Sequence, residues 1–136
     1  MVNIVGRSVP AVMLEDEEGS LMPIHIGNAE ALSINSVLRN ETMPRPMTHD
    51  LIVSMLERLG TRIESIFIDE KIDNIYYARL SLDREGSSIE FDARPSDCIA
   101  MALRQSAPIL IDRDIFADDS ISKESFQLSK SVDEME

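Results

Sequence analysis

The chain has 136 residues, of which 43% are hydrophobic and 28% are charged, as expected for a single water-soluble domain. No apolar run approaches the ~20 residues of a membrane span, and the N-terminus lacks the basic and apolar segments of a signal peptide, so we predict no membrane association and a cytoplasmic location. The net charge of −12 argues against tight electrostatic binding of nucleic acid. The single cysteine, Cys98, excludes an internal disulfide and is expected to be a small buried apolar side chain.

The first third of the chain predicts two strands followed by a helix. Residues 9–14 predict a strand whose side chains point alternately to its two faces and are apolar on both. An acidic turn leads from it to a second strand over 21–26. Gly27 or Asn28 can cap the next helix, which ends near Leu38. This order of elements predicts a hairpin packed against a helix.

A proline-rich connector separates this part from a second helix. Residues 43–47 read Met-Pro-Arg-Pro-Met, and each proline fixes its own φ and disfavours helical geometry in the residue before it. Thr48 is predicted to cap the helix that follows, Asp50 lies in its first turn, where the helix dipole favours an anion, and Gly60 ends it. The connector is therefore expected to be stiff.

The central part of the chain predicts two more strands and a buried helix. Residues 63–68 form a strand, a polar turn follows at 69–74, and a long strand runs over 75–82. Pro95 then opens a helix, since proline suits the first helical position, where its missing N–H is not needed. Residues 98–103 are apolar on every side, which is typical of a helix inside a core.

The sequence also contains an internal repeat. The segment 99–104 aligns with 34–39 at an offset of 65 residues, and Ile89 aligns with Ile24 at the same offset. Chance similarity between amphipathic segments is the alternative explanation. A long period that is present twice favours the duplication of one strand–strand–helix unit.

These patterns predict one α+β domain over residues 1–116, in which two strand–strand–helix units pack around mixed β-sheets. A last short strand is expected at 109–111. From residue 117 to 136 the chain is polar and acidic, so we expect a loosely ordered C-terminal tail.

Four segments carry a resemblance to a known family. They read PIHIGNAEA, PRPMTHDLIVSMLERLG, YYARLSL and DARPSDCIAMALRQSAPI. On these segments, from about Val9 to Phe116, the chain resembles the bifunctional nuclease family. The resemblance implies an α+β fold built by duplication, assembly into homodimers, and cleavage of both DNA and RNA without strong sequence preference.

Asp92, Arg94 and Asp97 form the first candidate site. For phosphodiester hydrolysis, the two carboxylates could be catalytic and hold Mg²⁺ or Mn²⁺, while Arg94 binds a phosphate oxygen of the substrate. The spacing alone is a weak pattern. A helix cap with a neighbouring ion pair is the structural alternative, and it is the commoner use of such residues.

Arg45, His49 and Asp50 form the second candidate site, at the start of the second helix. His49 could act as a general acid or base with Asp50 beside it, and Arg45 could bind a substrate phosphate because its flanking prolines hold it stiffly. Arg79, on the long strand, is a third candidate for substrate binding. For the cluster of Arg45, His49 and Asp50, plain helix capping is the alternative.

Two functions of different class remain open from the sequence. One is a divalent-metal-assisted nuclease of low specificity that binds nucleic acid weakly and forms homodimers. The other is a non-catalytic oligomeric interaction module, in which the Arg and Asp residues form structural ion pairs. The resemblance favours the first, whereas the net charge of −12 favours the second.

Overall fold

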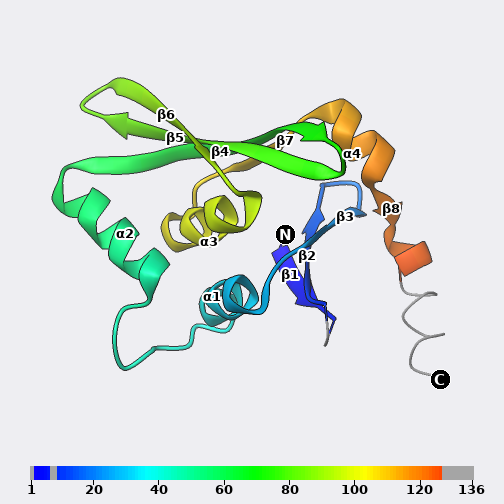
Figure 1. The fold of residues 1–136 in the computed structure, drawn as a ribbon, viewed down its shortest axis with the longest axis horizontal. Helices are drawn as coiled ribbons and strands as arrows, with labels where there is room; N and C mark the ends of the chain where they lie inside the picture. The colour runs from blue at the N-terminus through cyan, green and yellow to red at the C-terminus, as the bar shows by residue number, and fades with distance from the viewer. Residues whose placement is uncertain (1, 7–8, 127–136) are drawn as a thin grey trace.

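The computed structural model describes residues 2–6 and 9–126, and it shows an α+β domain with two four-stranded sheets (Figure 1). Sheet A has the strand order β1-β2-β3-β8, and all of its strand pairs are antiparallel. The prediction of mixed sheets is therefore wrong for sheet A, whose first three strands follow one another through short connections, as antiparallel pairing allows. Its strands are β1 (Val2–Val5), β2 (Ala11–Glu15), β3 (Ser20–His25) and β8 (Ile121–Ser122).

Sheet B has the strand order β6-β5-β4-β7 and is mixed, as predicted. Strands β4, β5 and β6 pair antiparallel, whereas β7 pairs parallel to β4 after the chain has crossed over through a helix. The turn between β4 and β5 is only two residues long, because β4 continues to Ile72 through the polar segment expected to be a turn. Sheet B contains β4 (Thr61–Ile72), β5 (Ile75–Arg84), β6 (Ser87–Ala93) and β7 (Ile109–Ile111).

Four helices and a helical turn at 123–126 complete the described part of the chain. The predicted cap of α2 is wrong by one position: Met47 is the N-cap, and Thr48 is the first helical residue. Asp50 explains the shift, because its carboxylate accepts a hydrogen bond from the Met47 amide at 2.9 Å, which is one half of a capping box. The helices are α1 (Asn28–Leu38), α2 (Thr48–Arg58), α3 (Pro95–Gln105) and α4 (Arg113–Asp119).

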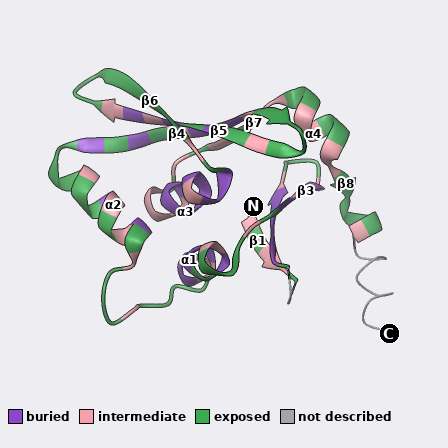
Figure 2. Cartoon of the chain, in the orientation of Figure 1, coloured by how far each residue is buried: buried purple, intermediate pink, exposed green. Residues whose placement is uncertain are grey.

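Helix α3 lies at the centre of the domain, between sheet B and α1, as its apolar sequence predicted (Figures 1 and 2). Its buried face packs on the inner sides of β4 and β5, and α2 covers its flank. Burial of apolar surface from both sheets and three helices supplies most of the stability of such a core. The largest fully buried side chains are Met22, Ile34, Ile66, Ile68, Ile99, Val12 and Cys98.

The two units of the repeat have the same order of elements in the structure. Strands β2 and β3 form an antiparallel hairpin that leads into α1, and strands β5 and β6 form another that leads into α3. Descent of the two units from one duplicated unit stays a prediction.

The chain beyond residue 116 is partly ordered where a loose tail was expected. Helix α4 continues to Asp119, whose carboxylate accepts hydrogen bonds from Tyr76 and, at 2.8 Å, from Lys71. Strand β8 then pairs with β3. Residues 127–136 of the predicted tail lie outside the described residues. No helix in the described part of the chain has the length and apolar character to cross a membrane, and the cytoplasmic location stays a prediction.

Candidate functional site

A pocket of about 840 Å³ lies where the first turns of α1 and α3 meet the β4–β5 hairpin and the end of α4. Its wall is apolar along β3 and at Ile75, and it carries cationic side chains from Arg94 and Lys71. Carboxylates from Glu30 and from the end of α4 also line it. The pocket therefore combines apolar surface with charges of both signs, as ligand sites commonly do. Its lining residues also include His25, Gly27, Asn74, Tyr76, Pro95, Ser96, Asp118 and Asp119.

Arg94 lines this pocket and also forms hydrogen bonds to residues that lead into the protein interior. It is the N-cap residue of α3 and has extended backbone geometry, because Pro95 begins the helix immediately after it. Its side chain is 65% exposed and donates from Nε and Nη2 to Asp97 at 2.9 and 3.2 Å, and from Nη1 to Glu30 at 2.9 Å. Hydrogen bonds from its guanidinium to Asp97 raise the pKa of Arg94 further. Three of its five N–H groups are used in these contacts.

Asp97 accepts hydrogen bonds from two sides. The Arg94 fork binds it from the pocket side, and His49 Nε2 lies 2.9 Å from its Oδ1 on the other. Burial alone would raise the pKa of Asp97, but the hydrogen bonds from Arg94 and His49 outweigh it, so the pKa lies below its usual value. Asp97 is therefore a carboxylate held in its charged form.

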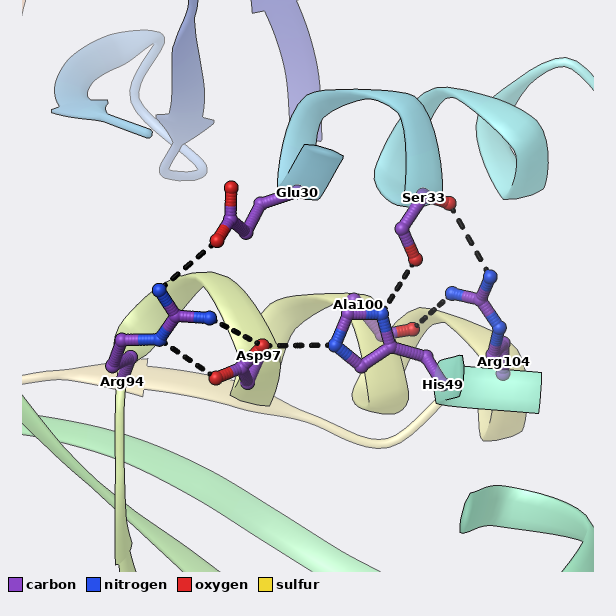
Figure 3. Close-up of polar contacts among 7 residues, drawn as sticks. All are labelled: Glu30, Ser33, His49, Arg94, Asp97, Ala100 and Arg104. Carbon is purple, nitrogen blue, oxygen red and sulfur yellow. Dashed lines mark hydrogen bonds and ion pairs between the residues drawn. The ribbon is translucent and has the colours of Figure 1, made fainter. Parts of the chain in front are cut away.

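His49 and Ser33 continue this chain of hydrogen bonds into the protein (Figure 3). His49 Nδ1 lies 2.6 Å from Ser33 Oγ, and both residues are buried, with 8% and 3% of their surface exposed. Because the charged carboxylate of Asp97 can only accept, His49 Nε2 must carry the hydrogen of this contact. The second ring nitrogen, Nδ1, is thereby directed at the Ser33 hydroxyl, which can either donate or accept in this contact.

A second link, through the buried side chain of Arg104, joins the same three helices. The Arg104 side chain, only 7% exposed, donates from Nε to Asp50 at 2.6 Å and from Nη2 to the carbonyl of Ser33 at 3.3 Å. Burial would raise the pKa of Asp50, but the hydrogen bonds from Arg104 and the Met47 amide lower it overall. Arg104 and Asp50 do not line the pocket at Arg94, so this pair joins α1, α2 and α3 structurally.

The structure combines parts of the two clusters that the sequence suggested separately. It brings His49 against Asp97 and Arg94, and it leaves Arg45 exposed on the connector, beside a different pocket of about 610 Å³ that Asp50 also lines. The sequence did not single out Ser33, Glu30 or Arg104. Glu30 and Ser33 are three residues apart and share one face of α1, which was the only available signal.

Asp92 does not join this site. It pairs in register with Arg79 on sheet B, and this face points away from the buried residues of β5 that pack on α3. Arg79 in turn forms ion pairs with Asp69 at 2.6 Å and Glu90 at 3.4 Å. Asp92 and Arg79 thus lie on the outer face of sheet B, whereas Asp97 lies on α3, on the inner side.

The Asp92 and Asp97 pair does not fit a shared metal site. The two residues lie on opposite sides of sheet B, and both oxygens of Asp97 already accept from Arg94. Within the described residues, no group of three or more His, Cys, Asp or Glu side chains is placed to hold a metal ion. Cys98 offers no alternative nucleophile, because burial raises the pKa of its thiol to about 12.

The sequence comparisons identify the family of this fold and site. The family model described as the bifunctional nuclease domain matches residues 12–124, which is most of the chain. The chain belongs to the bifunctional nuclease domain family. The match includes all the residues of the hydrogen-bond chain from Ser33 to Arg94, so this network lies inside the family domain.

Individual relatives agree with this assignment. An uncharacterised protein of Mycobacterium tuberculosis is 35% identical over 123 residues, which cover 85% of this chain and 73% of that protein. Bifunctional nuclease 1 of Oryza sativa subsp. indica is 34% identical over 110 residues, which cover 77% of this chain and 33% of the relative. Bifunctional nuclease 2 of Arabidopsis thaliana is 26% identical over 96% of this chain and 41% of its own length. The chain thus spans well under half of these two plant proteins.

Proposed function

We propose that the protein is a nuclease of low sequence specificity that hydrolyses phosphodiester bonds of DNA and RNA in the pocket at Arg94. The single observation that carries the proposal is the geometry of Arg94, which lines the pocket while the carboxylates of Glu30 and Asp97 fix its guanidinium. These contacts use three of the five N–H groups, and the two that remain can bind the oxygens of a phosphate and stabilise charge that develops on them. Family membership supports this chemistry, since the plant relatives are named bifunctional nucleases.

Lys71 and His25 are the other groups of the pocket that can serve this reaction. Lys71 can attract the phosphate backbone, although it already donates to Asp119 at 2.8 Å. His25 is exposed at the end of β3, lines the pocket, and has an imidazole that can exchange a proton with water or with a leaving oxygen. His25 therefore replaces the buried His49 as the candidate acid or base.

Binding of nucleic acid is proposed to be weak. The carboxylates of Glu30, Asp118 and Asp119 line the same pocket as the two cations, and the whole chain carries a net charge of −12. Long-range repulsion thus opposes the local attraction at Arg94. Few phosphates can be neutralised, so the affinity should fall with salt by a shallow slope.

Dependence on Mg²⁺ or Mn²⁺ remains part of the proposal. Because the Asp92 and Asp97 set does not fit, we assign no residue as a metal ligand. A divalent ion can also be held largely by substrate phosphates and water, with one or two carboxylates. When bound in that way it would offset phosphate charge and activate a water molecule.

The direct test is cleavage of fluorescent single-stranded DNA and RNA oligonucleotides by the purified chain, with Mg²⁺, with Mn²⁺ and with a chelator. The proposal predicts cleavage of both polymers with the ions and its loss with the chelator. Cleavage that persists at full rate in the chelator would remove the metal from the proposal. If neither polymer is cut under any condition, the nuclease assignment fails.

A non-catalytic interaction module is the second candidate. The observation that favours it is the pairing of the candidate residues with one another, since Arg94, Asp97, Asp50 and Arg79 all take part in ion pairs. In this alternative the same residues stabilise the fold and the exposed surfaces bind a partner. An inactive protein that still forms a stable complex would support it.

We also propose a homodimer, which the family resemblance implies, and we examine which surface could form it. Residues 11–14 of β2 are buried within the chain and leave no second face to cover. Exposed apolar side chains occur on several elements, among them Phe91 and Leu110 of sheet B. On α2 and its C-cap, Leu51, Met55 and Leu59 form a stripe at a spacing of four residues and are 54%, 53% and 67% exposed. This stripe is a suitable surface for a second copy of the chain.

A further inference from the structure

His49 and Ser33 are polar, nearly inaccessible and directly behind the wall of the pocket. Neither lines the pocket, whereas Arg94 does. A group that the substrate cannot reach does not exchange a proton with it directly, because general acid–base catalysis requires hydrogen-bond distance or one bridging water. Their function must therefore be exerted through the residues that they contact.

Those contacts form one continuous chain from α1 to the pocket. Ser33 Oγ and His49 Nδ1 form a hydrogen bond of 2.6 Å, and His49 Nε2 donates to Asp97 at 2.9 Å. Asp97 then accepts the Arg94 fork through both oxygens (Figure 3). Each contact fixes the orientation of the next group, in the way that outer residues orient the ligands of a metal site.

We propose that Ser33 and His49 are positioning residues, which hold Asp97 and through it keep the Arg94 guanidinium turned to bind a substrate phosphate. This inference rests on the proposed function of Arg94. It assigns His49 the part of a hydrogen-bond donor with a fixed tautomer, and it gives His49 no proton-transfer step. Asp97 in turn orients the Arg94 guanidinium by accepting its hydrogen bonds.

A comparison with Arg104 shows that the hydrogen bonds from Ser33 to Arg94 do more than join the helices. Arg104 also contacts α1 and α2, through the Ser33 carbonyl and Asp50, but its contacts do not lead to the pocket. Joining the three helices is thus already achieved by Arg104 without any ring at position 49. Only the His49 contact reaches Asp97 and Arg94.

The first test compares two substitutions of His49. Glutamine can place its amide N–H where His49 Nε2 lies, but it cannot act as an acid or base near neutral pH, whereas alanine does neither. We expect His49→Ala to lower kcat/KM for a single-stranded oligonucleotide roughly 10- to 100-fold, as the loss of an orienting partner does. His49→Gln should recover most of that loss. If both variants are equally impaired while both stay folded, a hydrogen-bond donor at position 49 does not support Arg94 and the positioning role is wrong.

The second test needs no catalysis. In the folded protein the Arg94 Nε–H, bonded to Asp97, should give a resolved ¹⁵N–¹H signal that shifts when inorganic phosphate is titrated in. Ser33→Ala should broaden this signal and weaken the phosphate response. Ser36→Ala is the matched control, because Ser36 is also a buried hydroxyl of α1 but donates only to the Ser33 carbonyl, at 2.7 Å.

The two tests separate the inference from the proposed function. If Ser33→Ala and Ser36→Ala leave the Arg94 signal equally sharp and equally responsive, the inference is overturned whatever the activity. If the wild-type protein shows no cleavage but Ser33→Ala alone disturbs the Arg94 signal, the positioning chain stands and the nuclease proposal falls. Thermal unfolding of each variant shows which of them remain folded for the comparison.

Discussion

At the scale of single residues, Asp97 is the point where stability and the proposed function meet. Its carboxylate accepts from His49 on the buried side and from Arg94 on the pocket side. Both contacts need the charged form. The local part of this arrangement, an arginine three residues before an aspartate at a helix start, is visible in the sequence. Its partner His49 is 48 residues away, and no sequence period indicates that pairing.

Asp97→Asn tests this residue directly. Asparagine can still accept one hydrogen bond, but its NH₂ group faces a donor, so we expect a loss of roughly 1–3 kcal/mol in the free energy of unfolding. This lies between the values for fully buried and fully exposed ion pairs. Urea denaturation at pH 7 measures it. An unchanged midpoint and slope would show that the Asp97 contacts contribute nothing to stability.

The same carboxylate predicts the sign of a pH dependence. The folded-state pKa of Asp97 lies below the ordinary value of 3.8, so its contribution is complete above the ordinary value and is lost as the pH falls through the lower one. The stability difference between wild type and Asp97→Asn should therefore shrink below about pH 4. A difference that stays constant down to pH 2 contradicts the assignment.

At the scale of elements, the strong periodic patterns predicted the helices α1 and α3 and the strands of sheet B. Two errors have clear physical causes. The turn between β4 and β5 was predicted too long because its polar residues suggested a loop, whereas Asp73 and Asn74 alone adopt the positive φ of 51° and 64° that a tight hairpin turn requires. Helix α4 was not predicted: its residues 113–116 were given no element, and the acidic residues from 117 were expected to be loosely ordered, whereas Lys71 and Tyr76 anchor the helix through Asp119.

Helix α2 leads to the prediction for assembly. Substituting both Leu51 and Met55 with serine should convert a dimer of twice the chain mass of 15.3 kDa into a monomer, since the stripe would lose its apolar contact. Light scattering on the eluting peak measures the mass. Leu32→Ser is a suitable control, because Leu32 is 51% exposed on α1, a different helix. A wild-type mass of one chain at micromolar concentration would contradict the dimer.

At the scale of the whole molecule, the protein is an acidic domain whose pocket at Arg94 carries two cations beside three carboxylates. Composition correctly indicated one domain, and the family resemblance was confirmed over most of the chain. The position of the pocket could not be predicted, because it forms where α1, α3, the β4–β5 hairpin and α4 meet. These elements are far apart in sequence, and only the packing of the two sheets brings them together.

The central claim is that Arg94 binds the substrate phosphate in this pocket, and one comparison of cleavage rates tests it most directly. The kcat/KM of Arg94→Ala is measured against that of Arg62→Ala, whose arginine is 76% exposed, pairs with Asp83 and does not line the pocket. We predict a loss of roughly 100-fold or more for Arg94→Ala, as expected when a group that stabilises developing charge is removed, and a change of less than about twofold for Arg62→Ala. Equal rates for the two variants would contradict the claim.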